Sequence, residues 1–237
     1  IEFTKIKVKT ITTSSATNLT LSNGTSFAND GNFTLDVIDW TVYSGQIRYQ
    51  GICGACYTFA TSDVVASLYS IYKFGFFIPL STQQVIDCST NGLTYGCNGG
   101  FLEGSYVYMQ IRGIQPDSVY PYTSSVDDSQ NNQSDGGPFK VASFRNIDEG
   151  IAKILLINEL WPSLIGIAGY RLQFYSDGIF NDCNSYIDHA VVLIGYKAGV
   201  GWKIKNSWGT EWGMQGFAWI QDGDNCGICS MAVSAKI

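Results

Sequence analysis

The spacing of apolar positions divides the chain into a helical first half and a strand-rich second half. Residues 57–74 contain no glycine or proline, and their apolar residues recur at helical spacings, which predicts a buried helix beginning near Cys56. Two shorter helices are predicted over residues 81–87, with Ser81 as the N-cap, and over residues 103–111.

The second half has a different pattern. Beyond Pro138 the apolar or aromatic runs are short and are bounded by glycine or polar residues, which is typical of strands. They cover residues 163–169, 190–196, 201–205 and 217–220. Residues 123–138 are rich in Ser, Asp, Asn and Gly, which predicts a surface loop. The order of elements predicts an α+β protein.

Residues 1–34 differ in composition from residues 35–237, which have the texture of a dense globular domain. Thr, Ser and Asn dominate this extension, and Lys5, Lys7 and Lys9 alternate with apolar residues, as in a strand with one charged face. One interpretation is a glycosylated extension or the remnant of a trimmed pro-segment. The other is a strand that pairs with a sheet edge, in this chain or in a second copy, which would allow self-assembly.

Composition narrows the classes of function. The 237 residues carry 14 basic and 20 acidic side chains, a net charge of −6, without a basic cluster for nucleic acid or an anionic membrane surface. No apolar run reaches the roughly 18 residues of a membrane span. Ile1 begins no signal-peptide pattern, so we expect the displayed chain to be processed or trimmed.

Cysteines and glycosylation sequons favour a secretory compartment. Seven cysteines suggest disulfides, and four Asn-X-Ser/Thr acceptors predict a glycoprotein. The acceptors are Asn18, Asn23, Asn32 and Asn132. We therefore expect a secreted, extracellular protein or one in a lysosomal or vacuolar lumen.

Cys56 is the candidate nucleophile. It stands at the start of the first predicted helix, where the helix dipole favours an anion and should lower the pKa of the thiol. A thiolate also needs a cationic partner, and His189 is the only histidine of the chain. His189 and Asn206 follow Cys56 at separations of about 130–150 residues, as in one class of cysteine peptidase.

Eight motifs in a consistent order over residues 37–234 resemble the papain-like cysteine peptidases, especially the cathepsin L-like branch. They are Asp39-Trp40, Gln50 to Tyr57, Cys97-Asn98-Gly99-Gly100, Tyr120-Pro121-Tyr122, Gly178-Ile179-Phe180, Asp188-His189-Ala190-Val191, Asn206-Ser207-Trp208-Gly209 and Cys226-Gly227-Ile228. The resemblance implies two lobes with a cleft between them. We expect a helical left lobe over about 45–137, and a β-barrel right lobe over about 138–237 that includes the N-terminal segment.

The resemblance also implies the catalytic roles. Cys56 would attack the scissile carbonyl and form an acyl-enzyme, with His189 as its acid–base partner. Asn206 would orient the imidazole, Trp208 would shield that hydrogen bond, and Gln50 would donate to the oxyanion. Tyr57 replaces the usual tryptophan, for which we expect only a change in packing.

Substrate-binding residues follow in the same way. Gly99 and Gly100 would pair with an extended peptide. The S2 pocket, which accepts the side chain two residues before the cleaved bond (P2), would be lined by Phe101, Leu102, Gly166, Ala190 and Met231. These residues imply apolar or aromatic P2 side chains. With one histidine, the chain lacks the histidine-bearing loop of the carboxydipeptidase relative, so we expect an endopeptidase that acts on peptides or proteins without a cofactor. Cystatin-like inhibitors are the other implied partners.

The resemblance pairs Cys53 with Cys97 and Cys183 with Cys226. Cys88 lacks its usual partner, and Cys88 and Cys229 could be bonded to each other or remain thiols. Two alternatives to a peptidase stay open. One is a structural or assembly subunit whose protease activity is unused. The other is a metal site on the two C-x-x-C pairs, which offer few ligands beside one histidine.

Overall fold

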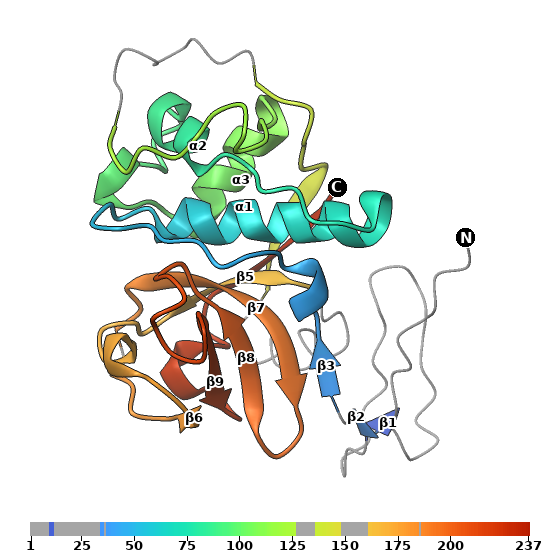
Figure 1. Ribbon diagram of the computed structural model, residues 1–237, viewed down its shortest axis with the longest axis vertical. Helices are drawn as coiled ribbons and strands as arrows, with labels where there is room; N and C mark the ends of the chain where they lie inside the picture. Colours follow the sequence, from blue (N-terminus) through green and yellow to red (C-terminus); the bar gives the residue numbers. More distant parts are fainter. Residues whose placement is uncertain (1–9, 12–33, 36, 127–135, 148–160, 185) are drawn as a thin grey trace.

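The structure is a computed structural model that describes residues 10–11, 34–35, 37–126, 136–147, 161–184 and 186–237. It has a helical lobe and a lobe built on a β-sheet, with the first helix between the other helices and the sheet (Figure 1). The alternating stretch 5–9 and the four acceptor asparagines of the glycosylation sequons lie outside the described residues. No helix within these ranges combines the length and hydropathy that a membrane span requires.

Among the described residues the helical lobe contains three α-helices, α1 (Cys56–Tyr69), α2 (Thr82–Cys88) and α3 (Leu102–Ile111). The predicted long helix ends as an α-helix at Tyr69 and continues as a π-helical segment, η2 (Ser70–Phe74), which Gly75 closes with a φ of 76°. Ser81 caps α2 as predicted, because its hydroxyl accepts from the backbone N–H of Gln84 at 3.0 Å. Short 3-10 turns are η1 (Thr41–Tyr43), η3 (Gly96–Asn98), η5 (Leu172–Phe174) and η6 (Asn225–Gly227).

The other lobe holds an eight-stranded sheet in the order β4-β10-β5-β7-β8-β9-β6, with β3 also paired to β7. The bounds are β3 (Val37–Asp39), β4 (Ser143–Ile147), β5 (Ser163–Ile167), β6 (Ile179–Phe180), β7 (His189–Lys197), β8 (Gly201–Lys205), β9 (Phe217–Gln221) and β10 (Ala232–Lys236). All pairs are antiparallel except β6 with β9. In the described part of the chain β4 and β6 end the path, so the expected barrel is present as an open sheet.

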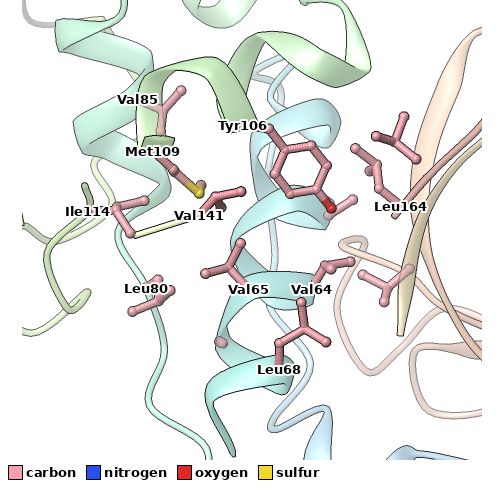
Figure 2. Packing of buried hydrophobic residues seen from close by; sticks show 14 of the residues in the cluster. Val64, Val65, Leu68, Leu80, Val85, Tyr106, Met109, Ile114, Val141 and Leu164 are labelled. Carbon is pink, nitrogen blue, oxygen red and sulfur yellow. The ribbon is translucent and has the colours of Figure 1, made fainter. Parts of the chain in front are cut away.

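Helix α1 is buried on every side, which explains why it fixes one lobe against the other. Val64, Val65 and Leu68 of α1 pack with the helices α2 and α3, and Leu164 from the sheet lies in the same cluster (Figure 2). The cluster also includes Val192 of β7. Each fully buried aliphatic side chain contributes roughly 1.5–3 kcal/mol. Cys56, the first residue of α1, is therefore held relative to β7.

At the N-terminal end, β1 (Thr10–Ile11) pairs with β2 (Thr34–Leu35) in a separate two-stranded sheet. Immediately beyond it, β3 pairs with the last residues of β7, Ile38 opposite Tyr196. The chain that follows the extension is thus joined to the sheet lobe before it enters the helical lobe.

Candidate active site

Cys56 is the first residue of α1, and no side chain caps this helix N-terminus. The backbone N–H groups of Ala190, Tyr57 and Cys56 lower the pKa of the thiol, but burial raises it by more, and Asp188 acts in the same direction as burial. The net pKa is raised, so the depression expected from the helix dipole alone is wrong. A thiolate at this position depends on a cationic partner.

His189 and Asn206 are brought together by adjacent strands. His189 begins β7, Asn206 follows β8, and these strands pair antiparallel with Val192 opposite Lys205. The Nε2 atom of His189 lies 2.8 Å from Oδ1 of Asn206, which also accepts the backbone N–H of Ser207 at 2.8 Å. Because an amide oxygen only accepts, Nε2 carries the proton and Nδ1 is left to accept one.

The imidazole is enclosed as well as oriented. The ring of Trp208 stacks on His189 with centroids 4.4 Å apart and planes 28° from parallel. Burial lowers the pKa of His189 to about 4, against smaller opposing contributions from Asn206 and Asp188. Asp188 is held by the backbone N–H of Gly169 at 2.6 Å, and a Cβ at Gly169 would lie 2.5 Å from that of His189.

The N-terminus of α1 lies beside the start of β7, the strand that begins with His189. The N–H of Ala190, the residue after His189, acts on the Cys56 thiol, so the helix N-terminus faces this end of the strand. Burial acts against charge on both the thiol and the His189 imidazole, so a charged form of either one requires a nearby opposite charge. Two opposite unit charges about 4 Å apart attract by about 4 kcal/mol at an effective dielectric constant of about 20.

Gln50 is fixed by its backbone and by its side chain. Its backbone N–H donates to Ser207 O at 2.9 Å, and its carbonyl accepts the Tyr122 hydroxyl at 2.7 Å. The side-chain amide donates to Cys53 O at 2.9 Å and accepts the Ser207 hydroxyl at 2.6 Å. These contacts set the amide orientation and leave its second N–H available. The sequence analysis assigned no role to Ser207, although this residue lies inside the motif Asn206-Ser207-Trp208-Gly209.

The Gly99–Gly100 segment is anchored to the start of α1. Cys53 and Cys97 form a disulfide with a Cα–Cα distance of 4.6 Å, and Gly54 N–H donates to Cys97 O at 2.9 Å. The Tyr57 hydroxyl donates to Gly96 O at 3.1 Å, and a Cβ at Gly100 would lie 2.9 Å from the Tyr57 ring. Gly99 has a φ of 100°, which favours glycine. Tyr57 therefore does more than change the packing.

Three of the five expected S2 residues meet on the sheet. Gly166 lies opposite Ala190 on paired strands, and a Cβ at Gly166 would lie 3.1 Å from Sδ of Met231. Ile187, which sequence reasoning missed, would meet the same Cβ at 2.9 Å. Its signal was an apolar side chain two residues before His189.

The other two expected S2 residues lie at the start of α3. Leu102 is buried in the same cluster as Ala190, and Phe101 is exposed.

The remaining cysteines answer the question of pairing. Cys183 and Cys226 form a disulfide with a Cα–Cα distance of 5.0 Å. Cys88 packs against the helical cluster and Cys229 lies in the sheet-lobe core, so they are not bonded to each other and both retain their thiols. Each C-x-x-C pair has one cysteine in a disulfide, and the described residues bring no three potential ligands together for a metal.

Comparison with known proteins shows the family of this chain. Residues 34–236 match the papain family cysteine proteases. Thiol protease SEN102 from Hemerocallis sp. is 31% identical over 89% of this chain and 61% of its own length. A cathepsin L-like proteinase from Fasciola hepatica is 31% identical over 97% of this chain and 74% of its own length. The chain spans about three fifths of the length of the first curated relatives it matches.

A solved structure gives the same result for the fold. The Carica candamarcensis cysteine protease CMS1MS2, determined with E-64, superposes with a TM-score of 0.77 at 32% identity, over 84% of this chain and 97% of that one. The matched range includes every residue of the site, from Gln50 to Met231. With its fold, its disulfides and its ordered motifs in agreement, the chain belongs to the papain family of cysteine proteases.

Proposed function

We propose that the chain is a thiol endopeptidase that cleaves peptide bonds through Cys56 and His189. The observation that carries this proposal is the position of the His189 imidazole, which is hydrogen-bonded to Asn206 and stacked on Trp208. His189 begins β7, and the backbone N–H of the next residue, Ala190, acts on the Cys56 thiol. Such an arrangement holds the ring in one tautomer with Nδ1 available to the thiol proton.

The reaction follows from these positions. Nδ1 takes the thiol proton, and the thiolate attacks the carbonyl carbon of the substrate to form a tetrahedral intermediate. The imidazolium then gives its proton to the leaving amine as the C–N bond breaks, leaving an acyl-enzyme. Water, deprotonated by the same imidazole, attacks the thioester and releases the acid and the thiol. His189 thus acts as base and acid in turn.

Gln50 is the proposed oxyanion donor. Ser207 and Cys53 hold its side-chain amide, so one N–H remains for the developing negative charge beside the backbone N–H of Cys56. A donor that is fixed before the reaction stabilises the transition state without reorganisation. This preorganisation is the main contribution that we assign to Gln50.

We assign P2 selectivity to an apolar pocket. Met231, Ala190, Gly166 and Ile187 lie together and carry no charge, and Met231 is 46% exposed and can meet a substrate side chain. Apolar or aromatic P2 residues are therefore preferred over arginine. Matched peptides with P2 Leu and P2 Arg test this preference, and equal kcat/KM values for the two would refute it.

Disulfides at Cys53–Cys97 and Cys183–Cys226 support a secreted or lumenal setting, because such crosslinks persist in oxidising compartments. We extend this proposal to glycosylation at the four sequons. A mobility shift of the secreted chain after treatment with an N-glycosidase is the expected result. The absence of a shift when all four sequons are intact would contradict glycosylation.

Active-site labelling tests the function directly. An epoxide of the E-64 type should modify Cys56 in the wild type and should leave Cys88 and Cys229 unmodified, as peptide mapping by mass spectrometry can determine. The His189→Ala variant should react much more slowly at the same site. Equal labelling of wild type and variant, or labelling without peptide turnover, would favour a structural or assembly subunit instead.

A further inference from the structure

A buried cluster of charged side chains lies between the two lobes, away from the reacting atoms. Asp63 on α1 accepts from Nη2 of Arg48 at 2.6 Å through Oδ1, and from Nζ of Lys205 at 2.8 Å through Oδ2. Asp63 is 5% exposed and Lys205 is 1% exposed, so water does not screen these contacts. One carboxylate uses both of its oxygens to join two cations.

The three residues belong to the three segments that supply the proposed catalytic groups. Asp63 lies two turns along the helix that begins with Cys56, and Lys205 immediately precedes Asn206. Arg48 precedes Gln50 by two residues. The cluster therefore connects the backbones that carry the nucleophile, the residue that orients the imidazole, and the oxyanion donor.

The cations are also fixed by the surrounding backbone. Nη1 of Arg48 donates to Leu80 O at 3.0 Å, its Nη2 also reaches Phe59 O at 3.3 Å, and its guanidinium lies over the Phe59 ring. Lys205 donates to Ser44 O as well. Each partner of Asp63 is thus held by at least one more contact, which leaves the carboxylate little freedom to shift α1.

Stability alone is a weak explanation for such a cluster. Desolvation offsets much of the attraction in a buried ion pair, and apolar residues of similar volume are often as stabilising. What the charged cluster adds is geometric selectivity, because two directional contacts define the position of α1 along β8. Apolar packing around Val64 and Leu68 lacks this directionality.

We propose that Asp63 is a positioning residue, which sets the distance between the Cys56 sulfur and the imidazole by tying α1 to the segments of Lys205 and Arg48. The inference rests on the proposed peptidase function. It assigns no contact with the substrate to Asp63. Its loss should therefore impair the chemical step more than substrate binding.

The test replaces Asp63 with Asn, which has the same shape and no charge. We expect kcat on a P2-Leu peptide to fall about 100-fold, as expected for a displacement of about 1 Å, with KM changed less than threefold. Alkylation of Cys56 by iodoacetamide at neutral pH should slow in parallel. The matched control is Asp182→Asn, which removes the carboxylate of the exposed pair with Arg171 and should leave both rates within twofold.

A double variant separates position from stability. Asp63→Asn/Lys205→Met leaves fewer uncompensated buried charges, so it should unfold at a higher temperature than Asp63→Asn, and it remains informative if the single variant fails to fold. Its kcat should stay low. Recovery of wild-type kcat in the double variant, or an unchanged kcat in a destabilised Asp63→Asn, would overturn the positioning role. A wild type without turnover would instead remove the proposed function, and this inference with it.

Discussion

The imidazole of His189 donates through Nε2 to the Asn206 side-chain oxygen at 2.8 Å, across the antiparallel pair formed by β7 and β8. The same oxygen accepts the Ser207 N–H, so two donors fix the amide orientation. The buried Nδ2 of Asn206 has no hydrogen-bond partner among the described residues. An unsatisfied buried donor costs free energy, so the asparagine at this position is explained by its side-chain oxygen, which accepts from His189 and Ser207, and not by its NH2 group.

Replacing Asn206 with Ala should therefore release the ring without removing it. We expect kcat to fall about 100-fold, because a misoriented base loses near-attack geometry, while KM for a short peptide changes little. Steady-state kinetics measure the effect. The control is Asn146→Ala on β4, which removes an exposed side-chain contact to Glu103 on α3 and should leave kcat unchanged. Equal activity of Asn206→Ala and wild type would exclude an orienting role.

Because His189 is the only histidine, an imidazole signal in the proton NMR spectrum belongs to it, and its protonation can be followed directly. In Cys56→Ser no thiolate is present, and the His189 ring should titrate with a pKa of about 4, since burial disfavours the imidazolium. In the wild type the thiolate should keep the ring protonated to higher pH. The proton NMR shift of the imidazole measures both values. Identical titrations in the two proteins would contradict the ion pair.

The same pKa predicts how the stability of Cys56→Ser depends on pH. An unfolded histidine takes up a proton near pH 6.5 and the folded one only near pH 4, so the unfolded state binds more protons between these values. Stability should be complete above pH 6.5 and should fall by about 3 kcal/mol as the pH drops to about 4. Urea unfolding at several pH values measures how the free energy of unfolding depends on pH. The double variant Cys56→Ser/His189→Asn should lack the part of this dependence that comes from the histidine.

The sequence was sufficient to predict the residues with a local signature. Helix periodicity and the Ser81 cap identified α1 and α2 within a few residues. Ordered motifs pointed to Cys56, His189 and Asn206 as candidate site residues. Strand β10 was missed because Ala232 to Lys236 mixes small and polar residues and takes its place from pairing with β4 and β5. Its position is a tertiary property.

The sequence could not predict what depends on contacts between distant segments. The role of Asp63 comes from Arg48 and Lys205, which lie far away along the chain, and a lone Asp inside a helix has no signature of pairing. The raised pKa of Cys56 could not be predicted from the sequence either. The helix N-terminus can be recognised in the sequence, but the burial of the thiol, which outweighs it, depends on the tertiary structure.

Gln50 offers a prediction in which two residues act on one hydrogen bond. Gln50→Ala should lower kcat by about 100- to 1000-fold if the amide donates to the oxyanion. Ser207→Ala should have a smaller effect, since it removes only the hydroxyl that holds Gln50 at 2.6 Å. If the two act together, Ser207→Ala should cost little more activity in the Gln50→Ala background. Fully additive losses in kcat would indicate that Ser207 acts elsewhere.

Gly100 tests whether the glycine segment binds the substrate backbone. An added Cβ would lie 2.9 Å from the Tyr57 ring and 3.2 Å from Leu93 O, so Gly100→Ala must displace this segment relative to α1. Because the displaced backbone would pair poorly with an extended peptide, KM should rise at least tenfold for a long substrate and less for a minimal one. The control is Gly92→Ala, which strains the backbone because the φ of Gly92 is 76°, but whose Cβ would meet nothing within 4 Å. An equal rise in KM for both variants would attribute the effect to a general disturbance of this loop rather than to lost pairing between Gly100 and the substrate backbone.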